Sequence, residues 1–242
     1  MSTALITGAS AGLGRALARA LAGQGWRLVI DARSRGGLER VADDLGAITD
    51  VTAIAGDVTD PWHRDRLVAA VDEHGGRLDL LVNNASTLGP SPLKSLALLS
   101  TEDLGAILAT NVEAPHALTQ RLLPALARSR GVLLNISSDA AVEHYEGWGG
   151  YAASKAALDH LSLTVAAENP GLTAYAVDPG DMRTAMHQLA FPGEDIGDRP
   201  EPETVVPALL ALLARRPKSG RYRASEFAPE AQSIATGTAV TA

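Results

Sequence analysis

Short, almost wholly apolar segments alternate along this chain with longer segments of helical periodicity, and this alternation limits the possible folds more than any other feature. The candidate strands are residues 3–7, 27–31, 51–55, 78–82, 131–137 and 172–177. Several are apolar at every position, which is typical of strands buried on both faces of a parallel sheet. Helical patterns lie near residues 13–23, 37–45, 62–74, 102–127 and 151–167. The alternation predicts an α/β fold, a doubly wound parallel sheet with helices on both faces.

No repeat or linker divides the 242 residues, so we expect a single domain over residues 1–242. Two segments depart from the alternation. Residues 181–203 mix apolar residues with Pro, Gly and acids, a composition that favours a lid or binding loop. Residues 229–242 are rich in Ala, Thr and Ser and are expected to form a peripheral tail.

Charge and composition exclude several classes of function. The net charge is −7 and no basic run occurs, so nucleic acid is not expected as a partner. The absence of cysteine excludes disulfides, thiol catalysis and thiolate metal sites, and no metal site is expected. No apolar stretch is long enough to span a membrane, and the start "MSTALITGAS" lacks the basic region of a signal peptide. We therefore expect no membrane association and a cytoplasmic location.

A glycine-rich turn follows the first predicted strand, in the segment "TGASAGLGRALA". Gly8, Gly12 and Gly14 precede a predicted helix, where glycine lets the backbone approach a phosphate and the helix N-terminus offers free N–H groups. The spacing is G-x-x-x-G-x-G, and an ordinary glycine-rich loop is the alternative. Its place at the first strand–helix turn of a doubly wound pattern favours a dinucleotide site.

The second strand ends in "IDARSR", which bears on the choice of dinucleotide. An acid at this point binds the ribose hydroxyls of NAD, whereas an arginine accommodates the 2′-phosphate of NADP. Both types occur here, as Asp31 and Arg33. After the third strand, Asp57 is a candidate to bind the adenine amino group or to cap the next helix, although Asp60, directly before a proline, is the better cap.

Further polar residues lie at predicted strand ends or within helices. Asn83 and Asn84 follow the fourth strand, where a structural turn is an equal reading. Asn111 lies within the long helical pattern 102–127, where asparagine is unfavourable unless another group uses it. Ser137 and Ser138 end the fifth strand, at the sheet edge where ligands bind in such folds.

Tyr151 and Lys155 lie four residues apart in "GYAASKAALDHL" and so share one face of a predicted helix. A cation beside a phenol favours the phenolate, which makes tyrosine usable as an acid and base near neutral pH. An amphipathic surface helix with an incidental Tyr and Lys is the alternative reading of these two residues alone.

Taken in order and spacing, these motifs resemble the short-chain dehydrogenase/reductase family in its compact, single-domain Rossmann-type form. The resemblance covers about residues 3–215. The matching motifs are "TGASAGLG", "GDV", "NNA", Asn111, "NISS", "YAASK" and "DPGDMRT". It implies an NAD(P)-dependent oxidoreductase, a carbonyl reductase or alcohol dehydrogenase, that acts on a small carbonyl or alcohol substrate.

The resemblance also implies roles for the matched residues. Tyr151 is the expected proton donor and acceptor at the substrate oxygen, and Lys155 is expected to lower the pKa of Tyr151 and to bind the nicotinamide ribose. Ser138 is expected to bond the substrate carbonyl, and Asn111 to hold a water in a proton relay. The implied cofactor-binding residues are Gly8, Ser10, Gly12, Leu13, Gly14, Arg33, Asp57, Val58, Asn84, Ala85, Tyr151, Lys155, Pro179, Gly180, Met182 and Thr184.

The family's ribose-binding acid falls, by counting, on Ala32, with Arg33 in the next position. Alanine neither bonds the ribose hydroxyls nor repels a phosphate, and a guanidinium matches phosphate oxygens. The resemblance therefore favours NADP(H). NAD(H) is the alternative, because Asp31 is only one residue from the ribose-binding position at Ala32. Arg15 and Arg35 are candidates to assist Arg33.

Two departures from the family pattern stand out. Ser86 replaces the last glycine of the usual "NNAG", which puts the backbone geometry beneath the nicotinamide in doubt. The sequence "SGRYRASEFAPEA" stands in place of the family's glycine-rich ending. Candidate pocket residues are His144, Trp148, Met182, Met186, His187 and Phe191, with packing roles equally expected.

Two other functions are alternatives on the same sequence. A non-catalytic dinucleotide sensor on the same fold would be expected to lose Tyr151 or Lys155, and a methyltransferase would not need Ser138, Tyr151 and Lys155 together. The helices 102–127 and 151–167 of this family commonly pack between subunits, so we expect a homodimer or homotetramer, which light scattering in solution would distinguish from a monomer.

Overall fold

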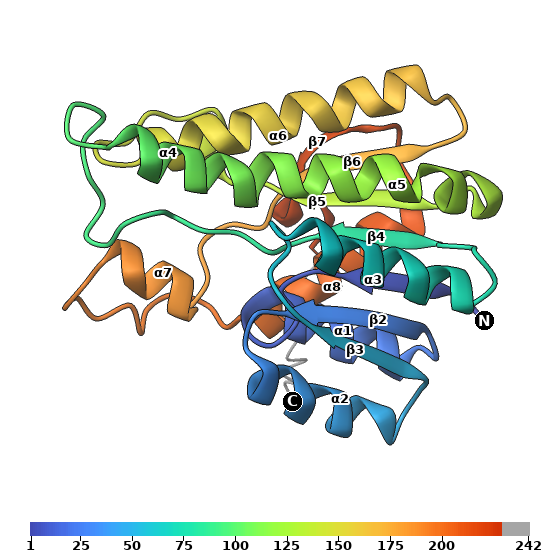
Figure 1. The fold of residues 1–242 in the computed structure, drawn as a ribbon. Helices are drawn as coiled ribbons and strands as arrows, with labels where there is room; N and C mark the ends of the chain where they lie inside the picture. Colours follow the sequence, from blue (N-terminus) through green and yellow to red (C-terminus); the bar gives the residue numbers. More distant parts are fainter. Residues whose placement is uncertain (229–242) are drawn as a thin grey trace, which may run out of the picture.

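A single sheet of seven strands, in the order β3-β2-β1-β4-β5-β6-β7, forms the centre of the computed structural model (Figure 1). Every neighbouring pair is parallel. The structure describes residues 1–228, so the predicted tail 229–242 lies outside the described residues. The order and direction of the strands confirm the predicted doubly wound parallel sheet.

All six predicted strands and all five predicted helical segments are present, with each end within two residues of the prediction. The strands are β1 (Thr3–Ile6), β2 (Arg27–Ala32), β3 (Val51–Ala55), β4 (Leu80–Asn83), β5 (Val132–Ile136), β6 (Thr173–Asp178) and β7 (Gly220–Arg223). The helices are α1 (Gly12–Gly23), α2 (Arg35–Gly46), α3 (Pro61–Glu73), α4 (Thr101–Leu108), α5 (Ala114–Ser129), α6 (Gly149–Glu168), α7 (Ala185–Ala190) and α8 (Pro202–Arg215).

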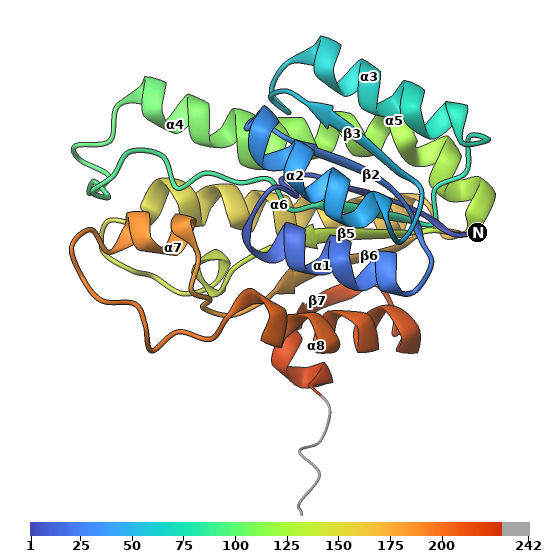
Figure 2. The ribbon, with the colours of Figure 1, turned by 90° about the horizontal axis from the view of Figure 1, so that it is seen from below.

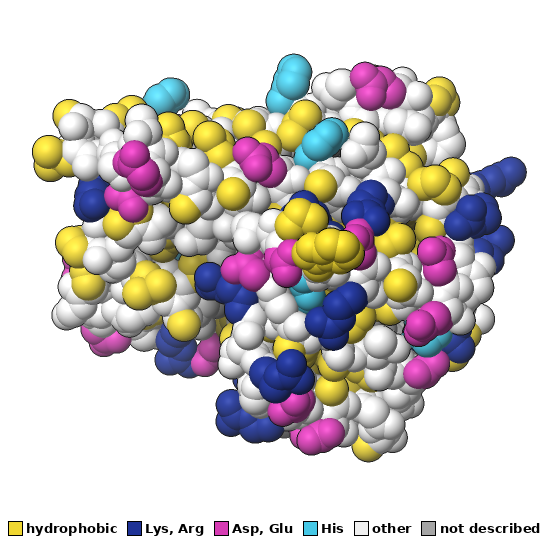
Figure 3. All heavy atoms as spheres, in the orientation of Figure 1, with side chains coloured by type: hydrophobic (Ala, Val, Ile, Leu, Met, Phe, Trp, Pro, Cys, Tyr) yellow, Lys and Arg dark blue, Asp and Glu magenta, His cyan; other side chains and the backbone are white. Residues whose placement is uncertain are grey.

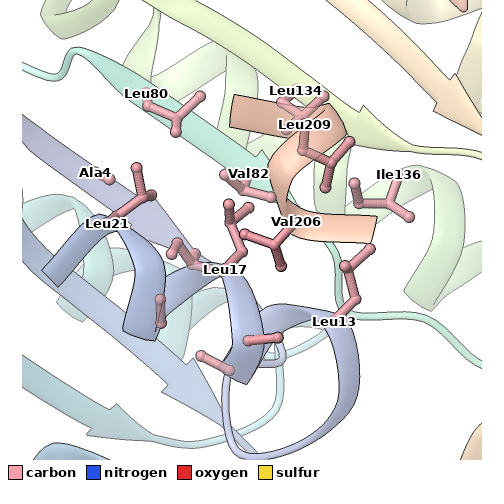
Figure 4. Packing of buried hydrophobic residues seen from close by; sticks show 14 of the residues in the cluster. Ala4, Leu13, Leu17, Leu21, Leu80, Val82, Leu134, Ile136, Val206 and Leu209 are labelled. Atoms are coloured by element: carbon pink, nitrogen blue, oxygen red, sulfur yellow. The ribbon is translucent and has the colours of Figure 1, made fainter. Parts of the chain in front are cut away.

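Alternate residues of each inner strand enter two separate cores. Ile6 and Ile30 belong to the core beneath α1, α2 and α8, whereas Leu5 and Val29 belong to the core beneath α3 and α5. Figure 4 shows the first core, where Leu17 packs among side chains of β1, β4 and α8. Because both faces of the sheet are covered, the inner strands are mostly apolar along their length, which explains the pattern in the sequence.

The long helical pattern 102–127 is interrupted at its middle. A π-helical turn, Ala109–Glu113, separates α4 from α5, and Asn111 in this turn is fully buried. Single π turns inside helices are rare and often lie at functional sites. The unfavourable mid-helix asparagine thus coincides with a change in helix geometry.

Three elements have no counterpart among the predicted ones. Helix α7 lies within the predicted lid, and α8 packs against α1 in the first core. Strand β7, with the sequence GRYR, pairs with β6 at the edge of the sheet. It carries no apolar run, because an edge strand needs backbone pairing more than burial, and so hydrophobic pattern does not reveal it.

The carboxyl ends of the strands lie at the end of the molecule opposite the N-terminus, where both ribbon views place α4 and α7 (Figures 1 and 2). The order of the strands reverses between β1 and β4. In doubly wound sheets, ligands bind outside the carboxyl ends of the strands at such a switch point. We therefore expect a ligand site at the turns after β1, β4 and β5.

On the face drawn in Figure 3, acidic and basic side chains are interspersed. Within residues 1–228, no helix has both the length and the apolar character needed to cross a membrane.

Candidate active site

A cavity of about 450 Å³ opens at the carboxyl edge of the sheet and brings together nearly all of the predicted site residues. It is lined by the turns after β1, β2, β3, β4 and β5, by α6, and by residues 178–182 and 184–187. Of the predicted catalytic and cofactor-binding residues, only Gly14 and Asn111 do not line it. Both of these lie behind the cavity wall, where they hold other wall residues in place.

The glycines after β1 allow an unusually close approach between two turns. A Cβ atom on Gly14 would lie 2.5 Å from both Asn84 Nδ2 and the Gly8 carbonyl oxygen, which real side chains do not tolerate. Gly8 has φ +68°, and a Cβ there would lie 3.0 Å from the Cα of Ala85. Gly14 is thus the packing point of the turn, and its assignment as a cofactor-binding residue stays a prediction.

Asn84 holds this turn from the end of β4. Its Nδ2 donates to the carbonyl oxygens of Thr7 at 2.8 Å and Gly8 at 3.2 Å, and its backbone N–H donates to Thr7 Oγ1 at 3.0 Å. Helix α1 then begins after Ala11, whose side chain makes no capping hydrogen bond. The first N–H groups of α1 thus have no side-chain cap, which fits a site for the pyrophosphate of a dinucleotide.

Asp31 is committed to the structure of the turn. Its Oδ1 accepts a hydrogen bond from the Gly8 N–H at 2.8 Å, and its Oδ2 lies 2.8 Å from His63 Nε2. Asp31 is fully buried, and burial raises its pKa even though His63 and Gly8 oppose the effect. Both carboxylate oxygens are therefore engaged inside the protein.

Arg33 lines the cavity, whereas the two arginines predicted as candidates to assist it do not. Arg15 lies 3.9 Å from Glu203, and Arg35 lies 3.8 Å from Glu39. Arg33 is thus the arginine of this group that is available to a ligand.

Asp57 also lines the cavity and does not cap the next helix. Burial opposes its ionisation, but hydrogen bonds from Thr59 and the positive charge of Arg33 hold its pKa below the usual value. Asp60 caps α3 by accepting from the Trp62 N–H at 2.9 Å, as the sequence predicts.

The side chain of Asn111 uses its full hydrogen-bonding capacity. Its Oδ1 accepts from the Thr87 N–H at 2.9 Å and from Ser86 Oγ at 3.1 Å. Its Nδ2 donates to the Thr87 carbonyl oxygen at 2.8 Å and to Ser154 Oγ at 2.9 Å. Asn111 thereby ties the loop after β4 to α6. Its role in holding a relay water stays a prediction, and its side-chain amide has no hydrogen-bonding position left for that water.

Ser86 occupies the family's glycine position without backbone strain. Among residues 1–228, the non-glycine residues with positive φ are Arg130 and Arg216, so Ser86 has an ordinary backbone conformation. The doubt that its presence raised about the backbone beneath the nicotinamide does not apply here. Its hydroxyl instead adds a hydrogen bond to Asn111.

Ser138 lies at the cavity wall beside a carboxylate that sequence analysis did not single out. Ser138 Oγ donates to Asp139 Oδ1 at 2.9 Å, and the Tyr145 hydroxyl donates to Asp139 Oδ2 at 2.8 Å. Burial opposes ionisation of Asp139, but the bonds from Tyr145, Ser138 and the Ala140 N–H hold its pKa below the usual value. Position alone, directly after Ser138, was the available signal for Asp139.

Tyr151 and Lys155 are both buried on the inner face of α6. The Lys155 ammonium lies 5.5 Å from the centroid of the Tyr151 ring and donates to the Ile136 carbonyl oxygen at 2.7 Å. Burial lowers the pKa of Lys155 to about 8, and the negative charge of Asp159 opposes this change. Lys155 thus lies where it contacts both the phenol and the end of β5.

The pKa of Tyr151 is raised above its usual value, mainly because burial disfavours the phenolate. The charges of Asp139 and Asp178 add to this effect, and the hydroxyls of Ser138 and Ser86 oppose it as hydrogen-bond partners. Burial therefore dominates the overall pKa of Tyr151, and the expectation that Lys155 lowers this pKa stays a prediction.

The open end of the cavity is partly aromatic. Of the candidate pocket residues, Trp148, Met182, Met186 and His187 line it, whereas His144 and Phe191 do not. The Trp148 ring packs edge-on against Tyr151, with 5.7 Å between centroids, and Phe191 packs behind Trp148 at 6.3 Å. This end of the cavity therefore offers an apolar surface beside Tyr151.

A family model described as short chain dehydrogenase matches residues 2–195 of the chain. The chain belongs to the short-chain dehydrogenase/reductase family. Membership makes this protein an oxidoreductase and its cofactor a nicotinamide dinucleotide, consistent with the glycine turn at the sheet's switch point.

Individual relatives of this short-chain dehydrogenase span most or all of its length. Serine 3-dehydrogenase from Agrobacterium fabrum is 31% identical over 243 residues, covering 96% of this chain and 96% of that protein. Sepiapterin reductase from Mus musculus is 37% identical over 202 residues, covering 77% of this chain and 76% of that protein. The structure of a short chain dehydrogenase from Shigella flexneri complexed with NADP superposes with a TM-score of 0.86 at 30% identity, covering 93% of this chain and 97% of that one.

The lowered pKa of Lys155 predicts a pH-dependent change in stability. The folded protein holds Lys155 at a pKa of about 8, against an ordinary value of 10.5. Between these values the unfolded chain binds more protons, so the free energy of unfolding should rise with pH. Lys155→Met removes this term. We expect the variant to be more stable than the wild type below pH ~8, by on the order of 3 kcal/mol, and this advantage to disappear towards pH ~10.

Urea unfolding of both proteins from pH 7 to pH 10 measures this difference. Lys94→Met is the matched control, because Lys94 is half-exposed and pairs with Asp103 on the surface at 3.0 Å. If the free energies of unfolding of the wild type and Lys155→Met differed by the same amount at every pH from 7 to 10, the prediction would be contradicted.

Proposed function

We propose that this short-chain dehydrogenase transfers a hydride between NADP(H) and a small carbonyl or alcohol substrate, with Tyr151 as the acid and base. The observation that supports this best is the meeting of Ser138, Tyr151 and Lys155 in the same cavity as the glycine turn after β1. The predicted site residues come from elements far apart in the sequence, and their convergence at the switch point of the sheet fits one shared reaction.

A bound nicotinamide would supply the hydride for the carbonyl carbon, and negative charge would then develop on the substrate oxygen. Tyr151 lies beside the apolar end of the cavity and donates its phenolic proton to that oxygen. Its raised pKa keeps the phenol protonated at neutral pH, so it is ready to act as the acid in the direction of carbonyl reduction.

Ser138 supplies the second donor to the developing charge. Its hydroxyl, which donates to Asp139, turns towards the substrate oxygen, while Asp139 keeps its bonds from Tyr145 and the Ala140 N–H. Lys155 brings a positive charge to the same region, and this charge stabilises the phenolate after proton transfer. In alcohol oxidation the same groups act in reverse, with the phenolate as the base.

Tyr151→Phe is predicted to reduce turnover of ketones or aldehydes by roughly 10²–10⁴-fold, the usual contribution of general acid–base catalysis. The phenol's ring remains, so NADPH should still bind, as measured by the change in NADPH fluorescence. Tyr222→Phe removes a hydroxyl that bonds the Lys218 carbonyl oxygen outside the cavity and serves as the control. Near-normal turnover in Tyr151→Phe would sink the assignment.

The preference for NADP(H) over NAD(H) is proposed from the turn after β2. Asp31 is buried with both oxygens engaged, Ala32 carries no polar side chain, and Arg33 lines the cavity. A free guanidinium at this point matches the 2′-phosphate of NADP. The Shigella flexneri relative that binds NADP supports the same choice.

Arg33→Ala is predicted to lower kcat/KM with NADPH by about 10- to 100-fold, as expected for a lost hydrogen bond to a charged group, and to change kcat/KM with NADH little. Arg35→Ala is the matched control, because Arg35 pairs with Glu39 and does not line the cavity. A wild type that prefers NADH, or a variant with unchanged preference, would show that Arg33 does not read the phosphate.

Residues 181–203 are proposed to be a lid over the substrate. Met182, Met186 and His187 of this segment line the cavity, whereas Leu189 is 53% exposed and does not face it. A hydrogen bond of 2.7 Å from Ser91 Oγ to the Leu189 carbonyl oxygen joins α7 to the loop after β4.

Hydrogen exchange should report the lid. We expect the amides of residues 185–190 to exchange more slowly when NADPH and a ketone are both present, because ligand contacts with Met186 and His187 stabilise the closed segment. The amides of β1 serve as the internal reference. Equal and strong protection of α7 in both conditions would identify a fixed structural element instead.

A further inference from the structure

One arginine on the edge strand β7 joins two parts of the candidate active site. Arg221 Nε donates to Asp159 Oδ2 on α6 at 2.8 Å, and Arg221 Nη2 donates to the carbonyl oxygen of Ser138 at 2.9 Å. The side chains of Arg221 and Asp159 are only 22% and 10% exposed, so this ion pair is largely shielded from water. A planar guanidinium can hold two acceptors in fixed directions at once.

Asp159 follows Lys155 by one helical turn, so the two side chains share a face of α6. Asp159 is buried, and within residues 1–228 its Oδ1 has no hydrogen-bond partner. Its negative charge is what opposes the loss of the proton from Lys155. The carboxylate thus interacts with Arg221 on one side and with Lys155 on the other.

We propose that Arg221 and Asp159 are positioning residues for the catalytic set, with Arg221 fixing the Ser138 turn to the helix of Tyr151 and Lys155, and Asp159 serving as the counter-charge of Lys155. This inference rests on the proposed function for its effect on turnover. It also gives the atypical C-terminal segment a role, because Arg221 lies in the part of the sequence that departs from the family pattern.

The other charged groups nearby mainly change the pKa values of Tyr151 and of Asp178 at the end of β6. Asp139 and Asp178 raise the pKa of Tyr151. The positive charges of Arg221 and Arg223 act to lower the pKa of Asp178 itself. Removal of the Asp159 charge should make Lys155 lose its proton at lower pH, whereas removal of the Arg221 charge should leave Asp159 unopposed and move the titration to higher pH. If the pair were merely structural, removal of the Asp159 charge and removal of the Arg221 charge would not shift the pKa of Lys155 in opposite directions.

The titration of Lys155 can be measured without any enzymatic activity. The chain contains three lysines, Lys94, Lys155 and Lys218, so selective ¹³C labelling of lysine gives few resonances. The resonance that is missing in Lys155→Met belongs to Lys155. We expect Lys155 to titrate at least ~0.5 pH unit lower in Asp159→Asn and at least ~0.5 unit higher in Arg221→Met. Arg27→Met is the matched control, since Arg27 Nε forms an ion pair of the same length, 2.8 Å, with Asp50 at the opposite end of the sheet.

Arg221→Lys separates the two roles. Lysine keeps the positive charge beside Asp159 but lacks the fork that reaches the Ser138 carbonyl oxygen as well. We expect Lys155 to titrate as in the wild type while kcat for ketone reduction with NADPH falls about tenfold and the dissociation constant of NADPH changes less than twofold. Asp159→Asn and Arg221→Lys both keep a polar side chain of similar size, so they test the proposal even where Arg221→Met fails to fold.

Two outcomes overturn the proposal: an unchanged Lys155 titration in Asp159→Asn, or wild-type kcat in Arg221→Lys. A wild type that reduces no ketone or aldehyde with NADPH, but in which Lys155 shifts as expected, would refute the proposed function and leave Asp159 established as the counter-charge of Lys155.

Discussion

The close approach of the turn after β1 to the turn after β4 is the constraint on which the rest of the site depends. It is possible only because Gly8 and Gly14 have no Cβ where Asn84 and Ala85 lie. The buried carboxylate of Asp31 fixes the Gly8 N–H from the other side. Movement of either turn would displace the start of α1, the wall formed by Asn84 and the floor of the cavity together.

Burial determines the chemistry at the other end of the cavity. Tyr151 and Lys155 are both removed from water, which disfavours the charged form of each, so the phenol holds its proton more strongly and the ammonium more weakly. At neutral pH the phenol is therefore held as the proton donor, whereas the two protonation states of Lys155 are brought closer in free energy. Its balance depends on a few fixed charges, among them Asp139 beside Ser138 and Asp159 beside Lys155.

Much of the fold and of the site could be predicted from the sequence, because the relevant signals are local. The first three residues of β4, Leu80, Leu81 and Val82, are all apolar, and the Tyr151–Lys155 spacing needs only a helix. Strand β7 could not be predicted, since its backbone pairing with β6 leaves no periodic signature. The π turn at Asn111 was equally hidden, because the partners of the Asn111 side chain, Thr87 and Ser154, lie in segments distant in sequence.

The sequence by itself determined the order of the elements, the place of the glycine turn and the residue types available for chemistry, since each follows from neighbours along the chain. Only the tertiary structure decided how those groups are used. It engaged both carboxylate oxygens of Asp31 with Gly8 and His63, and it placed Arg33 at the cavity wall. It also decided that the pKa of Tyr151 is raised overall, because desolvation depends on everything packed around a group, and that surrounding comes from strands and helices distant in sequence.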